Sequence, residues 1–135
     1  MVKGKAKGSS AERELLDRLW QSSFAVLRAA GSGSTSHDAC DLVAGRSGKS
    51  YAIEVKACVG NKQYISAEQM KELLDFSKAF GAQPFVAVKF TRKGWFILAA
   101  TKIKQTGKLF GVVKEEMRPL EDWIRAETIG FEIQQ

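Results

Sequence analysis

The sequence of 135 residues is poor in the side chains that build disulfide frameworks and zinc sites. It contains two cysteines, Cys40 and Cys58, and a single histidine, His37. Two cysteines cannot form the framework of a small secreted domain or the ligand set of a zinc ribbon. One histidine also leaves no basis for a Ser/His/Asp catalytic set. We therefore expect a cytoplasmic protein in a reducing compartment.

Long apolar runs, internal repeats and linker-like segments are also absent. No run approaches the roughly 18 apolar residues that a membrane-spanning helix needs. The basic residues at positions 1–8 are followed by no apolar stretch, so they do not form a signal peptide. With 44% apolar and 27% charged residues, the composition is that of a globular protein. We predict a flexible basic arm over residues 1–8 and a single domain over residues 9–135.

The charge is unevenly divided along the chain. The formal net charge is +6. Residues 1–114 carry 19 basic and 9 acidic side chains, whereas residues 115–135 carry 2 basic and 6 acidic ones. A basic body with an acidic end favours a polyanionic partner such as nucleic acid, although a basic surface that only aids solubility gives the same balance.

Caps, turns and apolar periodicity predict an α/β fold. A helix begins at a capping box formed by Ser9 and Glu12, and a second helix begins at Ser66 and ends at Gly81. The predicted strands cover residues 24–29, 41–45, 51–57, 85–90 and 95–99, with a further strand at 109–113 and a short helix at 119–126. The expected core is a central mixed five-stranded β-sheet flanked by helices, in which the helix between the third and fourth strands makes those two strands parallel.

Charged residues cluster on one face of the third predicted strand. Side chains alternate in a strand, so Glu54 and Lys56 share a face. A hairpin turn over residues 46–49 brings Asp41 towards them. Two carboxylates beside a lysine suit metal-assisted hydrolysis, since Mg²⁺ prefers oxygen ligands and a lysine stabilises developing negative charge. The alternative is a solvated pair of charges, with Asp41 as a turn residue.

Other candidates each have a structural alternative. Glu12 either completes the helix cap or adds a further acidic group to the site. Arg13 and Arg28 are either exposed side chains or phosphate contacts. Three serines, Ser32, Ser34 and Ser36, belong to a small polar loop that is suited to donating hydrogen bonds to DNA phosphates.

Two aromatic residues on the second helix, Phe76 and Phe80, are spaced four residues apart. They either pack in the core or form an exposed subunit interface.

Several blocks of the sequence, in order, resemble the archaeal-type Holliday junction resolvases of the PD-(D/E)xK nuclease superfamily. One block contains Glu54-Val55-Lys56, and another begins at Asp41. The blocks cover residues 7–16, 24–33, 41–45, 52–56, 76–82 and 86–90, followed by Trp95. Together they favour the catalytic interpretation over the solvated pair, and they imply a restriction-endonuclease-like core.

The resemblance implies a role for each candidate. Glu12, Asp41 and Glu54 would be the metal-site acids, and Lys56 the catalytic lysine. The expected metal is Mg²⁺, for which Mn²⁺ substitutes. Arg13, Arg28 and Ser32 would contact DNA, while Phe76 and Phe80 would lie at the interface of a homodimer. Apart from the resemblance, Ser34 and the arm lysines Lys3, Lys5 and Lys7 are further candidate DNA contacts. Gln69 falls where many nucleases of the superfamily place a helix residue near the site.

Two departures from the family pattern are visible. Cys40 precedes Asp41 where the superfamily name has proline. The segment after Trp95 matches poorly, so the acidic end receives no role. The expected activity is paired nicking of four-way DNA junctions in a nucleoid-associated enzyme of archaeal, bacterial or viral origin. The alternatives are a general or sequence-specific DNA endonuclease and a non-catalytic DNA-binding module.

Overall fold

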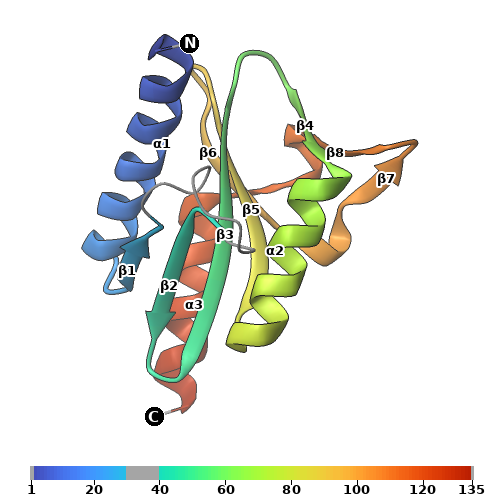
Figure 1. Cartoon of the computed structure of the whole chain (residues 1–135). Helices are drawn as coiled ribbons and strands as arrows, with labels where there is room; N and C mark the ends of the chain where they lie inside the picture. Colours follow the sequence, from blue (N-terminus) through green and yellow to red (C-terminus); the bar gives the residue numbers. More distant parts are fainter. Residues whose placement is uncertain (1, 30–39, 135) are drawn as a thin grey trace.

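A six-stranded mixed sheet forms the centre of the molecule (Figure 1). The computed structural model describes the backbone of residues 2–29 and 40–134 and the side chains of residues 10–29 and 40–130. The strands lie in the order β1-β2-β3-β5-β6-β9. Their bounds are β1 Ala25–Arg28, β2 Leu42–Arg46, β3 Lys49–Cys58, β5 Gln83–Phe90, β6 Gly94–Ala99 and β9 Arg118–Pro119. Strands β3 and β5 are parallel and the other neighbours are antiparallel, as the crossover helix predicts.

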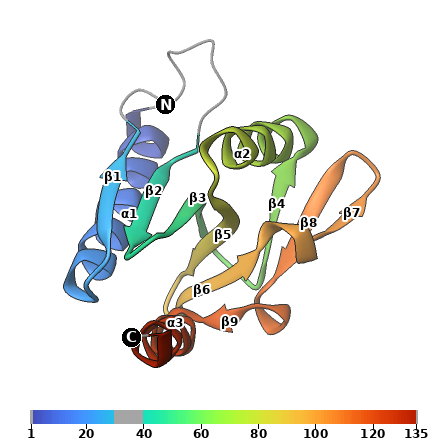
Figure 2. The ribbon, with the colours of Figure 1, turned by 90° about the horizontal axis from the view of Figure 1, so that it is seen from below.

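Three helices and a second small sheet cover the main sheet on both faces (Figure 2). Helices α1 (Val2–Gln21) and α3 (Leu120–Gln134) pack on one face. Helix α2 (Ala67–Phe80) packs on the other, beside a sheet ordered β4-β8-β7. The bounds of the remaining elements are β4 Lys62–Ser66, β7 Lys104–Thr106, β8 Leu109–Val113, η1 Ala100–Lys102 and η2 Lys114–Glu116. No helix among the described residues is long and apolar enough to cross a membrane.

The alternation of side chains in β3 and β5 divides the core into two clusters. Tyr51, Ile53 and Val55 face α1 and α3, whereas Ala52 faces α2. Glu54 and Lys56 therefore share the α2 face with Ala52. The buried apolar residues on both sides of β3 fix its register, because a slip by one residue would exchange the two faces. The charged pair is held on its face by this constraint.

The second helix begins and ends as the sequence predicts. The Ser66 hydroxyl accepts the backbone N–H of Gln69, and the Gln69 side chain accepts the N–H of Ser66. Gly81 ends the helix in the left-handed region at φ 87°, where a residue without a Cβ is favoured.

The beginning of the first helix differs from the prediction. Helix α1 starts at Val2, so the segment expected as a flexible arm is helical from that residue and Ser9 is not its cap. Lysine and alanine are good helix formers, which lets the helix continue through Gly4 and Gly8. Glu12 does not complete a cap, because its carboxylate accepts a hydrogen bond from Arg28 instead.

The end of the chain after Trp95, to which the sequence assigned no role, completes the fold. The sequence predicts five strands for the main sheet, to which the short β9 adds a sixth, and it predicts neither β4 nor β7. Helix α3 runs well beyond the predicted residues 119–126. Its Trp123 is 4% exposed and packs on the rings of Phe24, Tyr51 and Phe85. The acidic end thus covers an apolar part of the sheet.

We expect Trp123→Ala to lower the free energy of unfolding by about 3–5 kcal/mol, because it opens a cavity among three aromatic rings. Urea unfolding monitored by circular dichroism would measure the change. Ile129→Ala is the matched control, since Ile129 lies on the same helix but is 49% exposed, and it should cost less than about 0.5 kcal/mol. Equal effects of the two substitutions would contradict the docking of α3.

Candidate active site

Asp41 is fixed at the point where the chain enters β2. Its backbone N–H donates to the carbonyl of Ile53 at 3.1 Å, and its carbonyl accepts the N–H of Ala29 at 2.9 Å. Its carboxylate Oδ2 accepts the N–H of Val55 at 2.8 Å. These three contacts hold Asp41 between the end of β1 and the middle of β3, and the side chain is 9% exposed.

Glu54 lies beside Asp41 and is equally buried. The two carboxyl groups are close enough that each affects the pKa of the other. Burial is the largest cause that raises the pKa of each group. The negative charge of Asp41 further raises the pKa of Glu54, whereas the Val55 N–H opposes the shift at Asp41. Two partly desolvated carboxyl groups in contact favour a shared proton or a bound cation.

Lys56 connects the carboxylates to helix α2. Its Nζ lies 3.9 Å from Glu54 Oε2 and donates to Gln69 Oε1 at 3.1 Å. The same Gln69 oxygen accepts the N–H of Ser66 at the start of α2. The helix cap therefore also positions the lysine. The resemblance placed Gln69 near the site, and its contact with Lys56 follows from the packing of α2 on β3.

Glu12 lies at the α1 side of this cluster. Its carboxylate accepts a hydrogen bond from Arg28 Nε at 2.8 Å, and both side chains are partly buried. The charge of Glu12 contributes to the raised pKa of both Asp41 and Glu54. Arg13 follows it on α1 and is exposed. The structure thus brings Glu12, Arg28, Asp41, Glu54 and Lys56 to one region.

The remaining predicted contacts lie elsewhere. Phe76 stacks on Phe80 with ring centroids 5.4 Å apart, and Phe80 is 55% exposed. Ser32, Ser34 and Ser36 lie outside the described residues, as do the side chains of Lys3, Lys5 and Lys7.

The donor chemistry of the cluster fits a hard divalent cation. Asp41 and Glu54 supply carboxylate oxygens, and the nearest ammonium group, that of Lys56, is 3.9 Å from Glu54. Within the described ranges, no three acidic, histidine or cysteine side chains converge on one metal position. The carboxylate of Glu12 instead accepts a hydrogen bond from Arg28. Asp41 and Glu54 are two buried carboxylates with little compensating positive charge. A bound Mg²⁺ ion would offset their mutual repulsion.

We expect Glu54→Gln to stabilise the protein in a chelating buffer at pH 8, by on the order of 1–3 kcal/mol. A carboxyl group whose pKa is raised by folding contributes stability at low pH that is lost as pH rises through the folded pKa. The substitution removes this loss. At pH 4, where Glu54 is protonated in both states, the two proteins should differ little. Urea unfolding at both pH values measures the effect, and destabilisation at pH 8 would contradict the burial argument.

Comparison with known proteins places the chain in a recognised family. Residues 3–129 match the family model described as archaeal Holliday junction resolvase (Hjc). A crossover junction endodeoxyribonuclease Hjc of Archaeoglobus fulgidus is 39% identical over 116 residues, which cover 86% of this chain and 85% of the relative. The Hjc protein of the same name from Methanocaldococcus jannaschii is 43% identical over 91 residues, which cover 67% of this chain and 65% of that protein.

A solved structure gives the same result. The crystal structure of Archaeoglobus fulgidus Hjc, titled a Holliday junction resolvase from an archaeal hyperthermophile, aligns with a TM-score of 0.80 at 32% identity. The alignment covers 87% of this chain and 99% of that structure. The similarity therefore extends over nearly the whole fold, and the restriction-endonuclease-like core expected from the sequence is confirmed.

Proposed function

Because the chain belongs to the archaeal Holliday junction resolvase family, we propose that it is a structure-selective endonuclease that cuts four-way DNA junctions by paired, symmetric nicks. The observation that carries the proposal is the convergence of Asp41, Glu54 and Lys56 on one face of the sheet. The basic charge of residues 1–114 supports a DNA partner, which it would bind mainly through backbone phosphates.

The cofactor we propose is Mg²⁺, with Mn²⁺ as a substitute, held by Asp41 and Glu54. Glu12 would join them when Arg28 turns to a phosphate. Bound there, the ion would polarise a phosphoryl oxygen and lower the pKa of water. Mg²⁺ retains several waters when few protein groups bind it, so two carboxylates form a sufficient protein ligand set.

The chain's own residues orient the reaction. Asp41 is immobilised by the Val55 N–H, so its carboxylate has a fixed direction. Lys56, held by Gln69, places a positive charge beside the carboxylates, where negative charge develops on the phosphoryl oxygens. Water adds to phosphorus and the P–O3′ bond breaks. The products carry a 5′-phosphate and, after protonation of the leaving oxygen, a 3′-hydroxyl.

Substitution of either buried acid should separate cutting from binding. We expect Asp41→Asn and Glu54→Gln to reduce cleavage of an end-labelled four-way junction at least about a hundredfold. Both should bind it at least as tightly as the wild type, because each removes a negative charge. Glu68→Gln is the matched control, since Glu68 is an exposed acid at the start of α2, and it should cut normally.

A linear duplex of the same sequence tests selectivity. Cleavage that is confined to the junction and requires Mg²⁺ and Glu54 supports the resolvase. Equal cleavage of the duplex would indicate a general endonuclease, and binding without cleavage under Mg²⁺ or Mn²⁺ would indicate a DNA-binding module.

A homodimer fits the two-fold symmetry of paired nicks, and an apolar surface supports it. Helix α2 packs mainly against β3, β4 and β5, and the sheet continues beyond these strands through β2 to its edge strand β1. Leu27 on β1, Trp20 on α1 and Phe80 on α2 are 75%, 52% and 55% exposed. They border an open apolar pocket of about 480 Å³. A patch of this kind marks an interaction surface.

We expect Leu27→Ser combined with Phe80→Ala to shift the protein from dimer to monomer in sedimentation velocity at low concentration. The physical reason is the loss of two exposed apolar side chains from one surface. Leu109→Ser is the control, because Leu109 is 41% exposed on β8, away from this patch. An unchanged sedimentation coefficient in the double variant would argue against this interface.

A further inference from the structure

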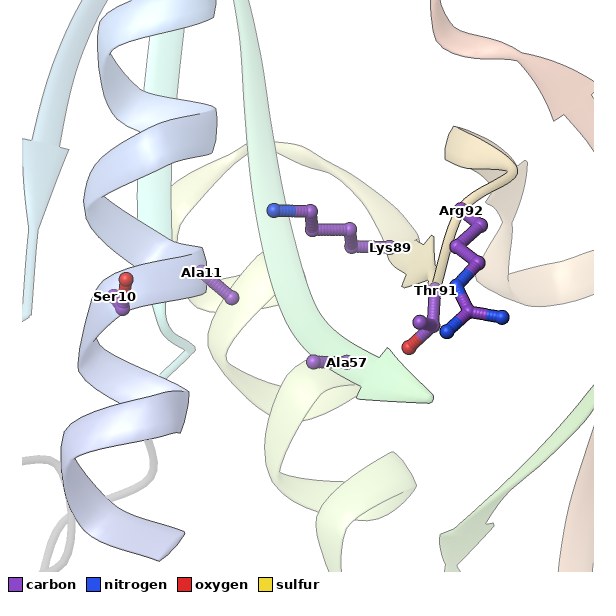
Figure 3. A pocket seen from close by; sticks show the side chains of 6 residues that line it. All are labelled: Ser10, Ala11, Ala57, Lys89, Thr91 and Arg92. Carbon is purple, nitrogen blue, oxygen red and sulfur yellow. The ribbon is translucent and has the colours of Figure 1, made fainter. Parts of the chain in front are cut away.

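A pocket of about 370 Å³ lies between helix α1 and the turn that joins β5 to β6. Figure 3 shows Lys89 extending from β5 across the pocket towards α1, with Thr91 and Arg92 side by side at the turn. The described residues that line it are Ser10, Ala11, Ala57, Lys89, Thr91 and Arg92. Two of these six residues, Lys89 and Arg92, are cationic and none is acidic, so their charges favour an anion.

The pocket adjoins the active site on two elements. Ala11 is followed on α1 by Glu12, and Ala57 follows Lys56 on β3. The side chain of Ala57 packs with the α1 cluster, whereas Lys56 faces α2. The pocket and the active site therefore lie on either side of β3, near its carboxyl end. Because β3 and β5 are parallel, their carboxyl ends share one edge of the sheet, along which a DNA strand would contact both.

The turn that carries Arg92 is anchored to β3. The N–H and the hydroxyl of Thr91 both donate to the carbonyl of Cys58, at 2.9 and 3.2 Å. The N–H of Lys93 donates to the carbonyl of Phe90 at 2.9 Å. Arg92 adopts a left-handed backbone with φ 66°. The base of its side chain is thus fixed at the edge of the pocket, which lowers the entropy lost when a ligand binds.

The two cations of the pocket differ in their availability. Lys89 Nζ lies 2.6 Å from a carboxylate oxygen of Glu14, which offsets its charge. In the part of the chain that the structure describes, no hydrogen bond or ion pair engages the guanidinium of Arg92, and the residue is exposed. Its planar donors match the oxygens of a phosphate. Arg92 therefore supplies the strongest anion contact.

We infer that this pocket binds one backbone phosphate of the DNA strand, next to the phosphate that is cut, with Arg92 as its main ligand. The inference rests on the proposed function, because it assigns a second contact to the same substrate. The ligand is a phosphodiester, recognised by charge and position without reading of bases. The contact would fix how the strand lies across the edge of the sheet.

The first test is the salt dependence of junction binding. Arg92→Ala, made in the cleavage-deficient Asp41→Asn protein, should weaken binding several-fold. It should also reduce the slope of log K against log salt concentration by about 0.9 for each pocket occupied. Lys102→Ala is the matched control. Lys102 is exposed and follows the far end of the same β5–β6 hairpin, so its loss should leave the slope unchanged.

A second variant places a negative charge in the pocket without removing a ligand. Ser10 is an exposed helical residue on the pocket wall. We expect Ser10→Asp to weaken binding more than Ser10→Ala, with thermal melting used to verify that each protein is folded. Equal affinities of the two variants would overturn the inference.

Ethylation of individual DNA phosphates locates the contact. For the Asp41→Asn protein, ethylation at the phosphate that is cut and at a neighbour should block binding. In the Arg92→Ala version, the neighbouring position alone should lose its effect. If Arg92→Ala behaves as Lys102→Ala does in both assays, the pocket is not a phosphate site even where junction cutting is confirmed. Junction and duplex could instead be bound and cut equally, with Arg92→Ala reducing the salt slope on both. That result would support the phosphate site and contradict the proposed selectivity for junctions.

Discussion

The hydrogen bond from the Val55 N–H to the Asp41 carboxylate is the contact on which the site depends. Asp41 lies just before β2, and its side chain accepts a hydrogen bond from a backbone N–H in the middle of β3. Its own N–H and carbonyl are bound to Ile53 and Ala29. One residue thereby joins β1, β2 and β3, so the direction of the carboxylate is set by the sheet rather than by a free rotamer.

The fold keeps this arrangement although it is electrostatically unfavourable. Asp41 and Glu54 are both buried, and burial raises the pKa of each. A charged pair of this kind opposes folding. The opposing contribution is the apolar core on both sides of β3, which includes the aromatic cluster around Trp123 on helix α3. The acidic end of the chain, far from the site, thus contributes to the stability that the site requires.

The sequence predicted those parts of the fold that depend on local signals. Three predictions are confirmed: the capping box at Ser66, the helix end at Gly81 and the parallel pairing of β3 with β5. Each could be predicted because its signal is a short local pattern or the order of elements along the chain. Strand alternation and one hairpin turn also placed Glu54 and Lys56 on one face near Asp41. The pairing of β4 with β8 joins residues 43 to 51 positions apart, so no local pattern revealed β4. The hydrogen bond from Arg28 to Glu12 likewise depends on tertiary packing, so the local cap motif could not predict it.

The double role of Gln69 restricts how this position can change in evolution. One oxygen of its side chain accepts from Lys56 and from the N–H of Ser66. A leucine would fit the helix but leave the Ser66 N–H without this acceptor and Lys56 with Glu54 alone, whereas a glutamate would retain both contacts. A substitution there alters helix start and lysine orientation together. Divergent relatives should therefore exchange position 69 only among acceptor side chains, or replace Ser66, Gln69 and Lys56 jointly.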